Sequence, residues 1–383
     1  MTTFASQDPQ FALPAPAQPG QALSQVDTPS LLLDLAAFER NLDRMQGRAD
    51  AAGVKLRPHA KAHKTPDIAL AQVARGAVGV CCQKVSEALP FVRAGIADIH
   101  ISNEIATPAK AALLAALARR ASMSVCVDDA RQVAMLEDAC RAADARLTVF
   151  VEIDVGQGRC GVKNAESALR LAEAIAGSSH LRFGGLQAYH GGAQHRRTRE
   201  ERRVAAARAA ESAAQTVVRL DAAGIACATV TGGGTGSVEF DLASGVYTEI
   251  QPGSYVFMDG DYGRNEWDAA SRFEHSLFIA STVMSVASGT RAVLDAGLKS
   301  MAVDSGLPTI WQPSPQALRY VAANDEHGIV EATDGTALPG LGAQVLLVPG
   351  HCDPTLNLYD EIVGFRDGRV ECLWPVAARG LSR

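Results

Sequence analysis

The sequence of 383 residues lacks the features that mark several large classes of protein. It contains no uninterrupted apolar run of membrane-spanning length, so we expect no ordinary transmembrane helix. Its start, MTTFASQDPQFALPAPAQPG, is rich in Pro and Ala and lacks the charged and apolar segments of a secretory signal peptide. The chain is therefore expected to be cytoplasmic.

An excess of positive charge is also missing. The formal net charge is −6, which gives no general attraction to phosphate backbones or anionic lipids. We therefore expect neither nucleic acid nor a membrane surface as a partner.

No CxxC pair occurs among the eight cysteines, and several lie inside apolar, strand-like runs such as GVCCQ and SVCVD. This pattern favours small buried hydrophobic residues over a reactive role, and no disulfide framework is expected. The cysteines are Cys81, Cys82, Cys126, Cys140, Cys160, Cys227, Cys352 and Cys372.

Two nucleotide-binding motifs are absent as well. No GxGxxG opens the first helix, which disfavours a doubly wound open sheet. A glycine-rich stretch, TGGGTGS (231–237), is present, but no GK[ST] follows it, which disfavours a nucleotide triphosphate.

Short apolar runs that alternate with helical patterns occupy the chain from Asp27 onward. Helical periodicity is clear in AKAALLAALARRA and AESALRLAEAIAGS. This alternation predicts parallel strands with helical crossovers, and eight strand candidates over roughly 230 residues fit a (β/α)8 TIM-type barrel. The candidates are SLLLDL (30–35), KLRPHAK (55–61), VGVCCQ (78–83), DIHIS (98–102), SVCVD (124–128), LTVFVEIDV (147–155), RFGGLQAY (182–189) and ATVTGG (228–233).

The pattern changes after about residue 265, where short strand-like runs are separated by Gly, Pro, Asp and Asn. FRDGRVECLW has the form of a hairpin with Asp-Gly at its turn. We therefore predict an N-terminal arm (1–26) packed on the β domain, the barrel (27–265), and a smaller, mostly β C-terminal domain (266–383).

The stretch LRPHAKAHKT carries the first candidate for chemistry. Side chains alternate along a strand, so Arg57, His59 and Lys61 would share a face with Lys61 at the strand end, while Lys64 would lie in the loop beyond. A solvated charge is the alternative interpretation of such a terminal lysine.

The TGGGTGS turn is the second candidate. Its glycines let backbone N–H groups converge on an anion, Thr235 and Ser237 add hydroxyls, and Gly253-Ser254 could add further donors. An ordinary flexible turn remains the alternative. A lysine facing a phosphate cradle suggests pyridoxal phosphate.

Long motifs across the chain resemble the D-threonine aldolase family, within the alanine-racemase-like (fold-type III) pyridoxal-phosphate enzymes. Its nearest relatives there are 3-hydroxy-D-aspartate aldolase and D-serine dehydratase. The motifs are RPHAKAHK, CCQKVSEALPFVRAGI, HISNE, VEIDVGQGRCGV, LQAYHG, TGGGTGS, DEHG, GHCDPT and the terminal ARGLSR.

The resemblance implies roles for individual residues around the cofactor. Lys61 matches the Schiff-base lysine, Arg159 the arginine near the phenolic oxygen, and Tyr189 the active-site tyrosine. Gln251 would face the pyridine nitrogen. The remaining cofactor-contacting positions are Gln83, Thr235, Gly236, Gly253, Ser254 and Tyr262.

The resemblance also implies a metal site at His351 and Asp353 in PGHCDPT. An H-x-D step alone is ordinarily a surface loop, because two ligands hold a metal weakly. One imidazole and one carboxylate suit Mn²⁺ or Mg²⁺ at least as well as Zn²⁺, with Co²⁺ a further option. Dehydratase relatives carry a cysteine where Asp353 stands, so the pattern favours an aldolase, and the Cys352 side chain is expected to point away.

The other polar candidates leave alternatives open. We expect His63, His190 and His195 to be supporting or surface residues, with His59 a candidate support for Lys61. The Asp325-Glu326-His327 turn either lines the site or is a solvated acidic turn.

These implications predict a homodimeric enzyme that cleaves D-β-hydroxy-α-amino acids, with D-threonine giving glycine and acetaldehyde. The alternatives are a 3-hydroxy-D-aspartate aldolase, for which Arg264 or Arg196 could bind the second carboxylate, and a D-serine or hydroxyaspartate dehydratase. A non-catalytic pyridoxal-phosphate carrier and a metal-only barrel hydrolase are weaker options.

Overall fold

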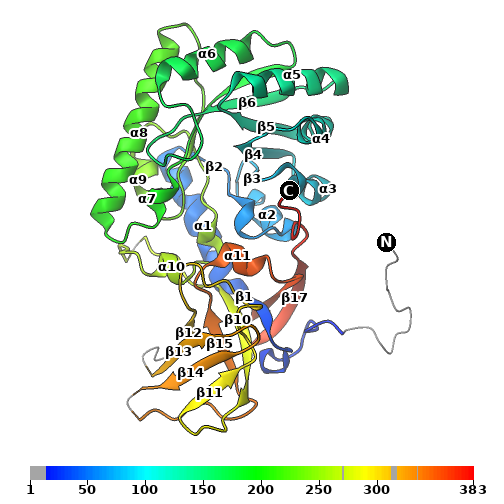
Figure 1. Ribbon diagram of the computed structural model, residues 1–383, viewed down its shortest axis with the longest axis vertical. Helices are drawn as coiled ribbons and strands as arrows, with labels where there is room; N and C mark the ends of the chain where they lie inside the picture. The colour runs from blue at the N-terminus through cyan, green and yellow to red at the C-terminus, as the bar shows by residue number, and fades with distance from the viewer. Residues whose placement is uncertain (1–13, 270, 312–316, 334) are drawn as a thin grey trace.

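The computed structural model, which describes residues 14–269, 271–311, 317–333 and 335–383, contains two separate sheets (Figure 1). The first is a parallel sheet of eight short strands in the order β2-β9-β8-β7-β6-β5-β4-β3. The ring closes between β2 and β3, where Val78 N donates to Leu56 O (2.9 Å) and His59 forms a bridge with Cys81. This confirms the predicted (β/α)8 barrel. Its strands are β2 (Lys55–Leu56), β3 (Val80–Cys82), β4 (Asp98–Glu104), β5 (Ser122–Val127), β6 (Leu147–Glu152), β7 (Leu181–Ala188), β8 (Val230–Gly232) and β9 (Glu249–Ile250).

The helices that surround the barrel begin and end at recognisable residues. Asp34 caps α1 by accepting from Ala36 N and Ala37 N, and Gly53 ends it with a φ of 66°. Both helices predicted from periodicity are present, as α4 and α6. The outer helices are α1 (Leu35–Ala52), α2 (Pro66–Val73), α3 (Ala88–Arg93), α4 (Pro108–Ala118), α5 (Ala130–Ala143), α6 (Ala165–Ala176), α8 (Arg199–Asp221) and α9 (Val238–Ala243).

The second sheet has nine strands and is mostly antiparallel. Its path is β13-β14-β11-β10-β1-β16-β17, with β15 paired to β10 and to β12. The predicted hairpin is present as β16 and β17, and Asp367 and Gly368 at its turn both have positive φ (49° and 72°). The strands are β1 (Ser30–Asp34), β10 (Leu277–Ser285), β11 (Arg291–Leu294), β12 (Thr309–Trp311), β13 (Leu318–Ala323), β14 (Gly328–Ala332), β15 (Gln344–Val348), β16 (Glu361–Arg366) and β17 (Arg369–Pro375).

One predicted barrel strand belongs elsewhere. SLLLDL forms β1, which lies between β10 and β16 in the second sheet, and the missing barrel strand is the two-residue β9. Leu31 and Leu33 join the main core while Leu32 packs in a second cluster, so β1 is buried on both faces. A strand of that kind has the same continuous apolar pattern in either sheet.

The described part of the N-terminal arm lies against the second sheet. Gly20 N donates to Val370 O (2.7 Å), and Val370 N donates to Gln21 O (2.9 Å), so the described part of the arm lies against β17. Ala17 and Val26 are buried in the second hydrophobic cluster.

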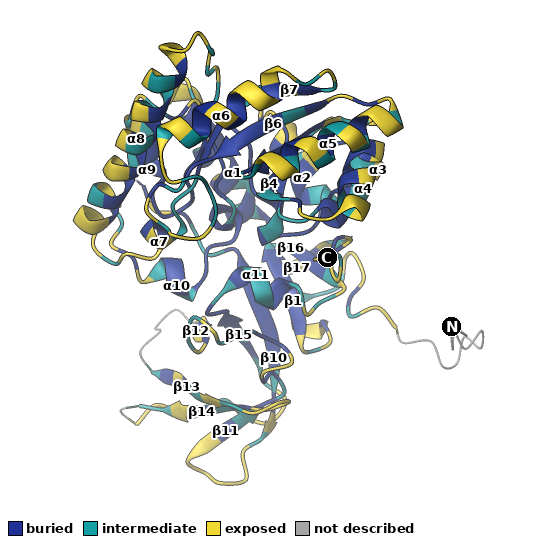
Figure 2. Ribbon diagram, turned by 45° about the horizontal axis from the view of Figure 1, so that its top comes forward, coloured by how far each residue is buried: buried dark blue, intermediate teal, exposed yellow. Residues whose placement is uncertain are grey.

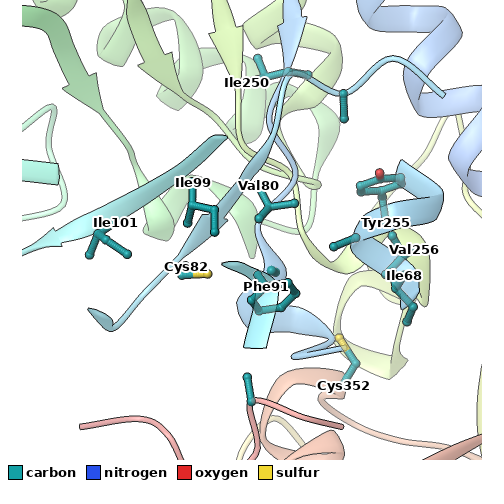
Figure 3. Packing of buried hydrophobic residues seen from close by; sticks show 14 of the residues in the cluster. Ile68, Val80, Cys82, Phe91, Ile99, Ile101, Ile250, Tyr255, Val256 and Cys352 are labelled. Carbon is teal, nitrogen blue, oxygen red and sulfur yellow. The ribbon is translucent and has the colours of Figure 1, made fainter. Parts of the chain in front are cut away.

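The main core runs from the barrel interior down to the short helix α11 (Cys352–Leu356), which Figure 1 shows between the barrel and the second sheet. In Figure 2 the barrel strands are largely buried while the outer helix faces are exposed. Figure 3 shows Cys352 beside the apolar residues around Ile68 and Tyr255, and its side chain is 0% exposed. All eight cysteines are free, five of them buried, as the sequence predicted.

No helix in the described part of the chain is both long and apolar enough to cross a membrane.

Candidate active site

Lys61 lies on a turn, not on a strand, which corrects the prediction for KLRPHAK. The β2 ladder ends at Leu56, and Pro58 has no N–H to extend it. After His59 N, which donates to Pro252 O (3.0 Å), the chain enters the 3-10 helix η3 (Ala60–Ala62). His59 Nδ1 accepts from Lys61 N (3.3 Å), so His59 supports the turn that carries Lys61.

Arg57 faces away from this turn, with Nη1 2.7 Å from Asp98 and Nε 2.9 Å from Glu249. Asp98 begins β4 and Glu249 begins β9, so the Arg57 side chain extends toward the amino-terminal end of the barrel. The alternation argument therefore fails for Arg57 and Lys61.

Lys61 and Lys64 differ in what their ammonium groups contact. Lys64 adopts a φ of 50°, and its buried Nζ lies 3.2 Å from Glu87 and donates to Asn357 (2.9 Å) and Ser382 (2.8 Å). The Lys61 side chain is 40% exposed and that of Lys64 is 8% exposed. Both lysines line the same cavity, but Lys61 has the more accessible side chain, while the Lys64 ammonium is already held by Glu87, Asn357 and Ser382.

The Lys61 ammonium forms an ion pair with the Asp353 carboxylate. Burial alone would lower the pKa of Lys61, but the Asp353 charge outweighs it and raises that pKa above its ordinary value. Burial would likewise raise the pKa of Asp353, but Lys61 lowers it to about 2. Both groups are therefore charged at neutral pH.

A cavity of about 590 Å³ lies where this pair joins the barrel to the β domain. Barrel residues and residues of the β domain both contribute to its wall, and Ser382 near the C-terminus closes one side. The lining residues include Lys61, Gln83, Val303, Asp304, His351 and Asp353.

His351 precedes α11, and Asp353 lies in its first turn. His351 Nδ1 lies 2.7 Å from Asp304 Oδ2, and because a carboxylate only accepts, Nδ1 carries the proton and Nε2 is left as a ligand atom. Cys352 N donates to Asp259 (2.9 Å), and the fully buried Cys352 thiol donates to Asp353 Oδ1 (3.4 Å). One imidazole nitrogen and one carboxylate on adjoining residues fit a divalent cation whose other positions are filled by water or substrate.

Arg159 and Tyr189 extend the site on the barrel side. The Arg159 guanidinium lies 5.6 Å from the centre of the Tyr189 ring. Burial raises the pKa of Tyr189, although the Lys61 and Arg159 charges oppose that shift. Tyr262 is buried, and burial raises its pKa, with Tyr189 as the next cause. The structure thus places two predicted site residues, Arg159 and Tyr189, in contact.

The glycine-rich turn is built differently from the prediction. Gly236 N, expected at the phosphate, donates to Gln194 Oε1 (2.8 Å), and a Cβ at Gly236 would lie 2.3 Å from Gln194 O. Ser237 N shares the same acceptor (3.2 Å). Gln194, which the sequence analysis did not identify, therefore shapes this turn.

Donors for a phosphate remain on both sides of the turn. The N–H groups of Thr235, Gly253 and Ser254 donate to no other group in the described ranges, and Thr235 and Ser254 add hydroxyls. A Cβ at Gly253 would come within 3.1 Å of His59 O, so glycine there lets the phosphate donors approach the Lys61 turn. This donor set fits the phosphate of pyridoxal phosphate.

Gln83 and Gln251 hold defined positions in the site. Gln83 Oε1 lies 3.1 Å from His59 Nε2. The Gln251 amide nitrogen donates to Gln187 and to Thr231, both at 2.8 Å, and its carbonyl oxygen accepts from the Gln187 amide nitrogen (3.3 Å). The pyridine contact of Gln251 remains a prediction.

The other predicted polar residues lie outside the cavity wall as supporting or surface groups. His63 is fully buried, and its ring lies 6.1 Å from the Phe91 ring in an edge contact, so it is a core residue. His195 contacts Asp261. The turn Asp325-Glu326-His327 is exposed, and Glu326 pairs with Lys299, so it is the solvated acidic turn of the two alternatives.

Asp304 is the second residue that the sequence did not reveal. It lies in a loop before β12, with no strand end or motif around it, and only the fold brings it to His351.

The chain matches two family descriptions. Residues 33–261 match "Alanine racemase, N-terminal domain", and residues 276–365 match "Putative serine dehydratase domain".

Individual relatives match over nearly the whole length. A D-threonine aldolase of Arthrobacter sp is 58% identical over 97% of this chain and 98% of the relative. A 3-hydroxy-D-aspartate aldolase of Paracoccus denitrificans (strain Pd 1222) is 46% identical over 95% of each chain. The crystal structure of D-threonine aldolase from Filomicrobium marinum covers 97% of this chain and 100% of its own, with a TM-score of 0.94 and 50% identity.

Proposed function

Because this chain belongs to the D-threonine aldolase family of alanine-racemase-like lyases, we propose that it cleaves D-configured β-hydroxy-α-amino acids. D-Threonine would give glycine and acetaldehyde. The observation that carries the proposal is the position of Lys61 and the His351-Asp353 pair on one cavity. An amine site and a hydroxyl site are then within reach of one small amino acid.

The residues of the cavity fit two added groups. Lys61 would hold pyridoxal phosphate, with Thr235, Gly253, Ser254 and Tyr262 around the phosphate, and bound pyridoxal phosphate supplies an electron sink for charge on Cα. His351 and Asp353 would hold a divalent cation, Mn²⁺ or Mg²⁺ before Co²⁺ or Zn²⁺, which lowers the pKa of a coordinated hydroxyl.

The chain's own residues then account for orientation and proton transfer. Asp304 fixes the His351 ring through Nδ1, so Nε2 is available either as a ligand or as the acceptor of the β-hydroxyl proton. Arg159 lies over the Tyr189 ring on the barrel side, where its charge could orient the cofactor. Val303 lies on the β-domain side, where a neutral β-substituent would have an apolar neighbour.

One assay tests this proposal. Purified protein loaded with pyridoxal phosphate is incubated with D-threonine, D-3-hydroxyaspartate and D-serine, with Mn²⁺ and with a chelator, and the products are identified. Glycine and acetaldehyde from D-threonine, formed only with metal, support it. Ammonia and a keto acid as the products, or full activity in chelator, would contradict it.

A second candidate, 3-hydroxy-D-aspartate aldolase, is favoured by one contact. Arg264 donates to Ser305 O (2.7 Å), next to Asp304, so a cation is near the His351 corner of the cavity. A β-carboxylate could be recognised there. In the same assay this candidate requires glycine and glyoxylate from D-3-hydroxyaspartate at a higher kcat/KM than for D-threonine.

Two further parts of the proposal are a homodimer, which the resemblance implies, and a cytoplasmic location, which the sequence analysis predicts from the composition of the N-terminal segment. Analytical ultracentrifugation of the loaded protein tests the first, and fractionation of cells that express it tests the second.

A further inference from the structure

Three potential metal ligands converge at the carboxyl ends of two barrel strands, β4 and β6, which lie on either side of β5. Glu104 ends β4, Glu152 ends β6, and Cys160 lies in the loop that follows β6. Each residue offers one ligand atom, and these three atoms lie within 4.8 Å of one another. None of these residues belongs to the proposed His351-Asp353 pair, which is on the β-domain side of the cavity.

The loop that carries Cys160 is held in place by its backbone. Asp154 N donates to Val162 O (3.0 Å), and Asp154 Oδ1 accepts from Gly156 N and Gly158 N, both at 3.0 Å. Gly161 has a φ of 97°, and a Cβ there would lie 2.6 Å from Asp154 N. The position of Cys160 is therefore fixed before any ligand arrives.

Two buried carboxylate oxygens in this cluster have no hydrogen-bonding partner among the described residues. They are Glu152 Oε2, on a residue that is 3% exposed, and Glu104 Oε1. Orphaned buried carboxylate oxygens are costly, so a cation or a shared proton must compensate for them.

The nearby charges favour a cation. Burial raises the pKa of Glu152, the Glu104 charge raises it further, and the Arg159 guanidinium, with Nη2 3.9 Å away, opposes that rise. Burial also raises the pKa of Cys160, to about 11. Two carboxylates and a thiolate around a divalent ion would leave one net negative charge, which Arg159 could balance.

We propose that Glu104, Glu152 and Cys160 form a second cation site, selective for Zn²⁺, beside Arg159. Two carboxylate oxygens and one sulfur are donors that Zn²⁺ accepts together, with water in the fourth position, whereas Mg²⁺ disfavours the thiolate. The three ligand atoms lie within 4.8 Å of one another, and zinc requires each of them at roughly 2.0–2.3 Å. Binding displaces the thiol proton and the proton that the carboxyl pair shares.

Equilibrium dialysis of the pyridoxal-phosphate-loaded protein against Zn²⁺ tests this site by counting bound ions. Wild type is expected to bind one more equivalent per chain than Cys160→Ser or Glu104→Gln. Equal numbers of bound Zn²⁺ ions in wild type and both variants would overturn the proposal. A shared proton would then compensate for the buried carboxylate oxygens. The two partly exposed positions are chosen because substitution there disturbs packing less than at Glu152, and thermal unfolding without metal checks the fold of each variant.

Co²⁺ gives an independent readout, because a cobalt-bound thiolate produces a near-ultraviolet charge-transfer band. The band is expected in wild type and in Cys352→Ser, and lost in Cys160→Ser. Cys352 is the matched control, because it is the thiol adjacent to the His351-Asp353 pair. A band that persists in Cys160→Ser, or that disappears in Cys352→Ser instead, would place the thiolate elsewhere and overturn the assignment.

Discussion

Lys61 and Asp353, 292 residues apart in the sequence, form an ion pair across the boundary between the barrel and the β domain. The pair ties the proposed cofactor lysine to the proposed metal carboxylate, so occupancy of one site changes the charge at the other. While the Lys61 ammonium is present, a cation must compete with it for Asp353.

Covalent attachment of pyridoxal phosphate to Lys61 removes that competitor, so we expect loading with the cofactor to strengthen Mn²⁺ binding. The pair is partly exposed, which limits the gain to about three- to tenfold, or ~1 kcal/mol. Calorimetric titration of Mn²⁺ into cofactor-free and loaded protein measures it. Lys61→Ala without cofactor should show the same gain, and an equal affinity in all three samples would rule out the coupling.

Lys61→Ala should abolish the visible absorbance of bound pyridoxal phosphate, because its amine is accessible from the cavity. Lys64→Ala should keep the absorbance, since the Lys64 ammonium already contacts Glu87, Asn357 and Ser382. Absorbance spectra of the two variants after reconstitution decide between them. Loss of the band in Lys64→Ala alone would reverse the assignment.

Glu87→Gln should lower the free energy of unfolding by about 3–5 kcal/mol, because it leaves the buried Lys64 ammonium without its carboxylate. The matched control is Glu326→Gln, which breaks the exposed pair with Lys299 and should cost about 0–1 kcal/mol. Urea unfolding of both variants at one pH gives the comparison, and equal losses would mean that the Lys64-Glu87 pair is not effectively buried.

Asp304→Asn should weaken metal binding by about 10–100-fold, because an amide no longer holds the His351 ring as a carboxylate does. The cofactor absorbance should not change. Mn²⁺ titration measures the affinity, with Asp325→Asn, at an exposed turn of the same domain, as control. An unchanged affinity in Asp304→Asn would show that His351 needs no such support.

Burial lowers the pKa of His63 to about 4, so the unfolded chain takes up a proton before the native protein does as the pH falls. The contribution of neutral His63 to stability is therefore complete above about pH 6.5 and decreases toward pH 4, by roughly 3 kcal/mol. Between pH 6.5 and pH 4, the unfolding free energy of His63→Gln should therefore fall by roughly 3 kcal/mol less than that of wild type, which gives a shallower slope against pH. The exposed His327→Gln should leave the slope unchanged, and parallel slopes for wild type and His63→Gln would contradict the expectation.

The barrel and the hairpin could be predicted because each depends on a local pattern. Apolar runs alternate with helical periodicity, and Asp367-Gly368 specifies its turn through positive φ. The placement of β1 could not be predicted, since a strand buried on both faces has the same sequence pattern in either sheet. The strand β9 has only two residues, which are too few to form a recognisable sequence pattern.

The residues of the candidate site also fall into those that the sequence could reveal and those that it could not. Lys61, His351 and Asp353 lie in distinctive motifs, and the structure brings them to one cavity. Asp304 and Gln194 act through single side-chain contacts with residues far along the chain, and nothing in their neighbourhood signals those contacts. The Gly236 N–H donates to the side chain of Gln194, a contact that depends on how two separate loops pack, so the phosphate contact of Gly236 remains a prediction.

The central position of β1 in the second sheet also has a consequence for biosynthesis. Leu31, Leu32 and Leu33 leave the ribosome early, but their partner strand β16 begins only at Glu361. β1 therefore remains unpaired on that side until nearly the whole chain has been translated. The barrel strands can already assemble during that time. The cavity between barrel and β domain is completed last, so a nascent chain contains the barrel lysine well before the proposed metal ligands are in place.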